Sequence, residues 1–302
     1  MPPFEHIFKL QMAFIIMKSP LLDRQKVLLC LIDILKQKNV ANKFMIVKTL
    51  FLLKQEERID NEMKFYNFFP YQYGPFSNSI YYDLNKLEDQ GLLVLEGNDL
   101  HSTKIGQELA GAVDVSVKQK IQRVIKRFGS EERIRRYVYK NYPSYTVKSR
   151  IGGARQTNKE PAAFSIGYES RDIDSFLNTM VENSIDTLVD IRWNPFSMNF
   201  SFTGKKLNEH LYRVGIGYLH IPALGIEGSQ RKNLVTPADY RTLFTIYKKR
   251  INESNTKELE EIKSLALAKR IALLCFEKDQ ANCHRGVISE HLASQKIPVT
   301  HL

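Results

Sequence analysis

Apolar side chains recur with helical spacing in the first part of the chain. Over residues 23–38 they stand three or four positions apart, which predicts a helix whose apolar face holds Val27, Leu28, Leu31, Ile32 and Leu35. Cys30 falls inside this run, and we expect it to be a core residue. Asn42 is a good helix cap, and a second helix follows it with Met45, Ile46, Thr49, Leu50 and Leu53 on one side.

A turn, a helix and a hairpin come next. The turn is predicted at residues 74–75, and Ser77 or Asn78 caps a helix with an apolar stripe of Ile80, Leu84 and Leu87. Residues 92–102 predict a short β-hairpin. Helices followed by a hairpin outline a winged helix-turn-helix, so we expect a mainly helical domain of that type over residues 1–115.

The charges of the predicted recognition helix argue against the usual docking on DNA. The helix carries Asp83, Glu88 and Asp89 against Lys86, and phosphate on both sides of a major groove repels carboxylates. Direct base reading by this helix is therefore less expected than its outline suggests. We expect the nearby aromatic side chains to be core residues: Phe65, Tyr66, Phe68, Phe69, Tyr71, Tyr73, Tyr81 and Tyr82.

Positive charge is concentrated in one segment of the 302-residue chain, whose formal net charge is +11. Residues 116–160 carry 13 Lys and Arg against 3 Asp and Glu, whereas the remainder is nearly balanced. Two amphipathic helices over residues 116–150 would present this charge as a basic extension, which suits nucleic-acid phosphate. A solvated surface helix is the alternative. The predicted contacts are Lys118, Lys120, Arg123, Lys126, Arg127, Arg133, Arg135 and Arg136.

Residues 61–150 resemble the winged-helix domain of Panacea-type antitoxins and related uncharacterised proteins. The resemblance rests on YQYGPFSNSIYYDLNKLEDQGLL and on VYKNYPSYTVKS. It implies a domain that serves protein partners as well as DNA. The glycine-containing, polar stretch IGGARQTNKEP then predicts a linker over residues 151–161.

Strands and helices alternate from residue 162 to the end of the chain, which predicts an α/β domain with a mostly parallel sheet. The order of its motifs, VDIR and HIP before an apolar strand that ends in Cys275, resembles the rhodanese-like fold. Ligands of such sheets bind beyond the carboxyl ends of the strands. This rule selects four loops, at residues 167–171, 190–197, 220–225 and 275–285.

Polar and aromatic side chains gather in these loops. The candidate catalytic residues are Glu277, Asp190, His284 and Cys283. The candidates for binding a substrate or its phosphate are Arg285, Arg192, Arg171, Tyr168, Trp193, Phe196 and Ser197. A structural role remains open for each: an Asp190–Arg192 salt bridge, a buried thiol at Cys275, a capping side chain at His284.

Residues 162–302 resemble the Domain of Unknown Function 488 family. The motifs are SIGYESRDIDSFL, LVDIRWNPFSMNF, KKLNEHLYRVGIGYLHIPALG and ALLCFEKDQANCHRGVISEHL. The family's cysteine and glutamate followed by Cys-His-Arg stand here as Cys275, Glu277, Cys283, His284 and Arg285. The resemblance implies the fold and this residue pattern, but no reaction.

Four functional interpretations remain open for this domain. The favoured one is hydrolysis or transfer at a base or nucleotide of DNA, resembling an N-glycosidase, with a carboxylate near the sugar. A thiol mechanism is a rival, although Arg285 stands at the wrong spacing from Cys275 and Cys283 for a phosphatase loop. A zinc site is disfavoured because adjacent Cys283 and His284 would not easily face one ion. A non-enzymatic regulator or defence-linked module that senses a nucleotide or modified base is the last.

Composition limits the setting in which this chemistry would occur. No apolar run is long enough for a transmembrane helix, no secretory signal is evident, and three scattered cysteines do not make a disulfide framework. We expect a soluble cytoplasmic protein without cofactor, metal or membrane partner. DNA is expected as a partner in preference to RNA, and a protein partner could bind through the winged helix.

Overall fold

The computed structural model describes residues 20–96, 99–154, 159–231 and 234–302. It divides into two compact units: the chain up to residue 68 with residues 74–145, and residues 69–73 with 146–302. The first of these contains most of the predicted basic extension. Residues 155–158 of the predicted linker, the hairpin turn at residues 97–98 and the first nineteen residues of the predicted N-terminal domain lie outside the described residues.

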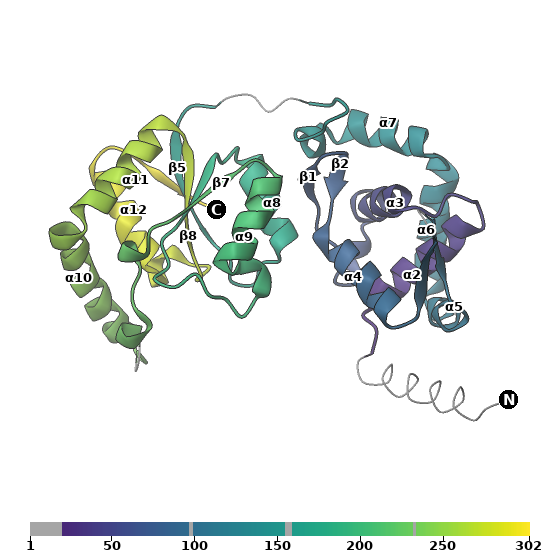
Figure 1. Cartoon of the computed structure of the whole chain (residues 1–302), viewed down its shortest axis with the longest axis horizontal. Coiled ribbons are helices and arrows are strands. Elements are labelled where there is room, and N and C mark those ends of the chain that lie inside the picture. Colours follow the sequence, from purple (N-terminus) through teal and green to yellow (C-terminus); the bar gives the residue numbers. More distant parts are fainter. Residues whose placement is uncertain (1–19, 97–98, 155–158, 232–233) are drawn as a thin grey trace. The chain divides into compact units, whose positions relative to one another are not determined.

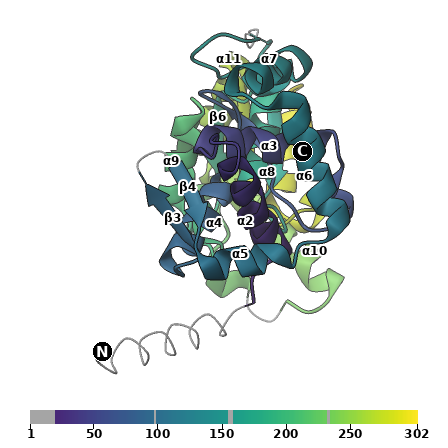
Figure 2. The same ribbon diagram turned by 90° about the vertical axis from the view of Figure 1, so that its right-hand side faces the viewer.

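The N-terminal unit is mainly helical, as predicted (Figure 1). Its helices are α2 (Asp23–Lys36), α3 (Lys43–Gln55), α4 (Asn78–Asp89), α5 (Lys104–Gly111), α6 (Val115–Phe128) and α7 (Glu131–Asn141). Strands β3 (Leu93–Glu96) and β4 (Asp99–Ser102) pair antiparallel as the predicted hairpin. The hairpin lies beside α4 and α2 (Figure 2). The turn expected at residues 74–75 is displaced, because Gly74 and Pro75 begin strand β2 (Gly74–Phe76), which follows β1 (Phe69–Tyr71).

Side-chain caps fix the starts of two helices, α3, whose cap the sequence predicted, and α7. The Asn42 side chain accepts a hydrogen bond from the Met45 amide at the start of α3. Ser130 accepts one from the Arg133 amide at the start of α7. Each satisfies an amide that has no partner within its helix. Helix α6 then buries the predicted apolar face, made of Val117, Ile121, Val124, Ile125 and Phe128.

The prediction that Asp83 adds negative charge to the surface of α4 is wrong. The Asp83 carboxylate is fully buried and accepts hydrogen bonds from Arg24 Nε at 2.8 Å, Gln25 Nε2 at 2.7 Å and the Tyr66 hydroxyl at 3.0 Å. It therefore adds no negative charge to the exposed side of the helix. The prediction of aromatic core residues also fails in two places, because Tyr73 and Tyr82 are exposed.

The C-terminal unit is an α/β domain, as predicted. Its five strands are all parallel, in the order β7-β6-β8-β5-β9. They are β5 (Ala162–Gly167), β6 (Thr187–Asp190), β7 (Gly217–His220), β8 (Arg270–Cys275) and β9 (Val299–His301). Strands β5, β6 and β8 are almost entirely buried, which fits a sheet that is covered on both faces.

Helices cover both faces of this sheet (Figure 1). Helices α10 (Pro237–Ser254), α11 (Thr256–Ala268) and α12 (His284–Ser294) lie on one side, and α8 (Ile173–Glu182) and α9 (Gly204–Arg213) lie on the other. Asp172 is the cap of α8, since it accepts a hydrogen bond from the Ser175 amide. Within the described ranges, no helix has both the length and the apolarity needed to cross a bilayer.

Candidate functional site

A pocket lies at the carboxyl edge of the sheet, where parallel sheets bind their ligands. The strand register aligns Gly167 with Cys275 and Asp190 with Leu274, so three of the predicted loops begin at the same edge. These loops line a cavity of about 580 Å³. Most of the predicted binding residues belong to its lining, whereas the candidate catalytic residues Glu277, Asp190, His284 and Cys283 do not.

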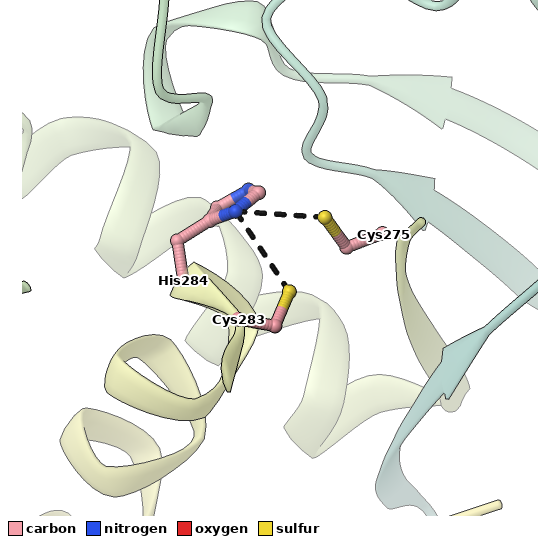
Figure 3. Close-up of side chains that lie close together, drawn as sticks. All are labelled: Cys275, Cys283 and His284. Carbon is pink, nitrogen blue, oxygen red and sulfur yellow. Dashed lines mark hydrogen bonds between the residues drawn. The ribbon is translucent and has the colours of Figure 1, made fainter. Parts of the chain in front are cut away.

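Cys275, Cys283 and His284 form a buried cluster beside this pocket (Figure 3). His284 Nδ1 lies 3.5 Å from the Cys275 sulfur and 3.8 Å from the Cys283 sulfur. The three side chains are 1–2% exposed. Cys275 also lines the pocket, so the cluster adjoins the space in which a ligand would bind.

Glu277 and Arg231 extend the cluster toward solvent. The Cys275 thiol donates to Glu277 Oε2 at 3.0 Å, and Arg231 Nη1 donates to Glu277 Oε1 at 3.0 Å. Arg231 Nη2 lies 3.2 Å from His284 Nδ1. Both Glu277 and Arg231 are half-buried. The carboxylate therefore links the sulfur cluster to a pocket-lining cation.

The hydrogen bonds of His284 define its tautomer. Its Nε2 lies 3.1 Å from the carbonyl oxygen of Ile191, which only accepts, so Nε2 carries the proton. An arginine only donates, so Nδ1, facing Arg231, holds a lone pair. This lone pair faces both sulfur atoms. The sequence argument that adjacent Cys283 and His284 would not face one point is therefore wrong.

The two thiols and Glu277 share their protons unequally. Burial raises the pKa of Cys275, but hydrogen bonds from neighbouring side chains, that from Cys283 foremost, more than offset it, so this pKa falls well below its ordinary value. Burial and the charge at Cys275 raise the pKa of Cys283 well above the ordinary value, and they also raise that of Glu277. The proton is therefore held more firmly at Cys283 and Glu277 than at Cys275.

Asp190 and Arg192 form the salt bridge that the sequence offered as their structural alternative. Arg192 Nε donates to Asp190 Oδ1 at 2.8 Å, and Arg192 Nη1 donates to the Tyr168 hydroxyl and to the carbonyl of Phe202. Asp190 is fully buried and accepts a further hydrogen bond from the Tyr218 hydroxyl. This geometry gives Asp190 the role of holding Arg192 and leaves it no surface for contact with a substrate.

Arg285 is also a structural residue in this geometry. It is 1% exposed, and its guanidinium donates to the backbone carbonyls of Glu277 and Lys278. It therefore fixes the loop after β8, so phosphate binding by this side chain is not supported. Gly167 lets the backbone of this loop come close to β5, because a Cβ atom at residue 167 would lie 1.9 Å from the Glu277 carbonyl oxygen.

Arg171 is the predicted phosphate-binding residue that keeps its charge available. It lines the pocket, and its guanidinium donates to Thr179 Oγ1 at 3.3 Å. Among the described residues no carboxylate forms an ion pair with it. Burial and the neighbouring Arg285 lower its pKa, as expected for a cation held without a counterion. Next to it, Ser170 has a φ of 60°, a conformation that non-glycine residues adopt mainly where the surrounding structure imposes it.

Exposed aromatic side chains stand around the same pocket. Trp193, Phe196 and Phe276 are 46%, 64% and 47% exposed. Their open faces suit stacking on a planar ligand. Tyr168 is not available in this way, because it is buried and its ring stacks on Phe202 with centroids 4.4 Å apart. Ser197 lines the pocket as predicted.

A family model described as "Domain of unknown function DUF488" matches residues 172–292. Residues 172–292 of the C-terminal unit are therefore similar to this family, and they are called the DUF488 region below. The match runs from the cap of α8 into α12, so β5 and β9 lie outside the matched residues. No curated protein and no solved structure matches the chain.

Sequence reasoning missed two side chains at this pocket. Arg231 stands 46 positions before Glu277, in a loop with no motif, and the selected loop after β7 ended at residue 225. Phe276 lay within a selected loop between two named residues, and its position directly after a buried strand was the available signal.

The basic segment preceding the DUF488 region is partly neutralised. Lys120 pairs with Glu62, Arg123 with Glu57, Arg127 with Glu56 and Arg136 with Glu132. Lys118 donates to the carbonyl of Gly111. In the described part of the chain no ion pair engages the remaining predicted contacts, which are the exposed Lys126, Arg133 and Arg135.

Proposed function

We propose that the DUF488 region is a hydrolase or transferase that acts on a base or nucleotide unit of nucleic acid, in the manner of an N-glycosidase. One observation carries the proposal: exposed aromatic rings and Arg171, which has no acidic partner among the described residues, line one pocket at the ligand-binding edge of the sheet, and the half-buried Glu277 contacts two further lining residues, Cys275 and Arg231. A planar base, a phosphate and a glycosidic bond need these three kinds of group.

The residues divide the work as follows. Trp193 and Phe196 stack on the base, and Arg171 binds the adjacent phosphate. Glu277 removes a proton from water as the water oxygen bonds to the sugar carbon, and this proton passes to the departing base as the bond between base and sugar breaks. Arg231 holds Glu277 through Oε1, and the Cys275 sulfur lies 3.0 Å from Oε2, the oxygen that we assign to this exchange.

The N-terminal unit is proposed to be a winged-helix domain like that of Panacea-type antitoxins. Helices α2, α3 and α4, followed by the β3–β4 hairpin, support it. The exposed side of α4 carries Tyr82, Glu88 and Asp89. An aromatic and acidic surface suits a protein partner better than DNA phosphate, so nucleic acid is assigned to the α6–α7 segment.

The pocket assignment is tested by incubating the full chain with single- and double-stranded DNA, with RNA and with DNA that contains modified bases. Released bases, nucleotides and abasic sites are measured by mass spectrometry. We expect Trp193→Ala and Arg171→Ala to lower the rate of product release at least about tenfold, a loss of about 1.4 kcal/mol in transition-state binding.

Tyr212→Ala is the matched control, because Tyr212 is an aromatic residue of α9 that is 82% exposed and does not line the pocket. It should leave the rate unchanged. Equal losses in all three variants would contradict the pocket assignment. Binding of nucleic acid without any product would reject the enzyme and favour a non-enzymatic sensor of a nucleotide or modified base.

A further inference from the structure

We propose that Cys275, Cys283 and His284 bind one Zn²⁺ ion. Their donor atoms, two sulfurs and one imidazole nitrogen, all lie within 4.8 Å of one another. Two thiolates and an imidazole are ligands that zinc prefers. This inference does not depend on the proposed reaction, since it rests on the geometry of the three side chains.

The two sulfur–nitrogen separations match the edges of a tetrahedral zinc site, and the sulfur–sulfur separation is at most 4.8 Å. With Zn–S and Zn–N bonds of about 2.3 and 2.0 Å, a sulfur and a nitrogen on one ion stand about 3.5 Å apart. The observed separations are 3.5 Å from His284 Nδ1 to the Cys275 sulfur and 3.8 Å to the Cys283 sulfur. In Figure 3 the imidazole nitrogen and both sulfurs point toward the same small space.

The surroundings of His284 are those of a metal ligand. Metal-binding histidines usually donate their second ring N–H to a carbonyl or carboxylate, which fixes the ring and leaves the other nitrogen free to coordinate. His284 Nε2 donates to the Ile191 carbonyl in this way. The Tyr247 ring packs against the imidazole edge-to-face at 5.6 Å, which holds its orientation.

The fold holds the ligands on two firm elements. Cys275 is the last residue of β8, Cys283 is the cap of α12, and His284 is the first residue of that helix. Because the fold brings all three together, little ordering is needed on binding. Zinc displaces one proton from each thiol, and the resulting unit of Zn²⁺ with two thiolates is neutral. Neutrality limits the cost of placing the ion in a buried site.

Glu277 adjoins the three donor atoms but is not one of them. Its Oε2 is 3.0 Å from the Cys275 sulfur, but its carboxylate is outside the group of donors that all lie within 4.8 Å. Three protein ligands and one solvent position are typical of catalytic zinc. Arg231 contacts His284 Nδ1, so zinc binding exchanges this contact for the metal bond, while the Arg231–Glu277 ion pair can persist.

The experiment measures metal in the full chain, purified without chelator, and then follows titration of the chelator-treated protein with Zn²⁺ or Co²⁺. We expect about one zinc per chain. Co²⁺ should produce the visible bands of a tetrahedral site and a sulfur-to-cobalt charge-transfer band in the near ultraviolet. Excess Zn²⁺ should remove these bands.

Variants assign the ligands. Cys275→Ser, Cys283→Ser and His284→Asn should each weaken zinc binding by about 100-fold or more. Cys30→Ser is the matched control, because Cys30 is a buried free cysteine in the other unit, and it should bind zinc like the wild-type chain. Glu277→Gln should also retain zinc, which separates the metal site from the proposed reaction.

Three results would overturn the proposal. The first is less than about a tenth of a zinc per chain together with no cobalt spectrum. The second is a loss of zinc in Cys30→Ser that equals the loss in the three ligand variants. The third is a Cys275–Cys283 disulfide, found by mass spectrometry, in protein that takes up no zinc even after reduction. A folded wild-type chain, confirmed by circular dichroism, is required for each reading.

Discussion

Lys48 is a buried cation in the N-terminal unit. Its ammonium donates to the carbonyl of Pro75 at 2.8 Å and lies 5.2 Å from the centre of the Phe44 ring. No carboxylate in the described part of the chain forms an ion pair with it. Burial therefore lowers the pKa of Lys48 from 10.5 to about 7. The folded unit holds this side chain neutral at a pH where the unfolded chain holds it charged.

This difference predicts a pH dependence of stability. Between pH 7 and 10.5 the unfolded chain binds the proton and the folded chain does not, so the free energy of unfolding rises with pH in this window. The slope is at most about 1.4 kcal/mol per pH unit. Below pH 7 the cost of the buried charge is fully present.

Lys48→Met removes the charge and should be more stable than the wild-type chain at pH 6.5, with an advantage that shrinks toward pH 10. Denaturant unfolding at both values measures it. The exposed Lys38→Met serves as control and should show no such trend. An advantage of Lys48→Met that is independent of pH would contradict the assignment.

Single residues also show where sequence reasoning reached its limit. The chemistry of Asp83, Asp190 and Arg285 suggested surface charge, catalysis and phosphate binding. The fold alone brings Asp83 into contact with Arg24. It likewise brings Arg285 into contact with backbone carbonyls. The partners of a side chain decide its role, and the sequence alone does not identify these partners.

At the scale of elements, the loop after β8 is placed by a close backbone approach to β5. A Cβ atom at Gly167 would lie 1.9 Å from the Glu277 carbonyl oxygen and 2.7 Å from its carbon. Backbone atoms cannot yield as a flexible side chain does. The absence of a side chain at residue 167 therefore sets the position of the segment that carries Cys275 and Glu277.

Gly167→Ala should lower the free energy of unfolding by about 2 kcal/mol or more, because the loop must shift to admit the methyl group. Gly111→Ala is the matched control: Gly111 ends α5, and a Cβ atom there would meet nothing within 4 Å. It should change stability by less than about 1 kcal/mol, in the stabilising direction. Equal effects, measured by denaturant unfolding, would refute the close-approach argument.

Most elements could be predicted because their signals are local. Periodic apolar residues and the cap Asn42 identified helices, and the apolar run of β8 identified a buried strand. The carboxyl-edge rule then located the pocket without any structure. The sulfur–imidazole geometry could not be predicted, because the directions of Cys283 and His284 depend on how α12 begins relative to β8.

At the scale of the whole molecule, the number of basic residues overstates the positive charge that is available to bind nucleic acid. Three of the predicted contacts in α6 pair with carboxylates near the end of α3, and a fourth pairs within α7. Each paired cation releases fewer counterions on binding to nucleic acid. Phosphate contact should therefore depend mainly on Lys126, Arg133 and Arg135.

Replacing these three residues with alanine should weaken binding to DNA and flatten its salt dependence. The slope of log K against log salt should fall by up to about 3, close to one per lost contact. Alanine at the exposed Lys104, Lys249 and Lys257 removes the same charge elsewhere and is the control. Binding titrations at several salt concentrations measure both. Equal slopes in the two triple variants would mean that binding follows net charge alone.

The measurement that tests the proposed function most directly compares the wild-type chain with Glu277→Gln on nucleic-acid substrates, by mass spectrometry of products and by affinity. We predict that the wild-type chain releases a base or nucleotide. The variant should lose at least about 100-fold in rate and bind the substrate within about threefold of the wild-type affinity. Product release that is unchanged in Glu277→Gln, or a wild-type chain that binds without releasing any product, would contradict it.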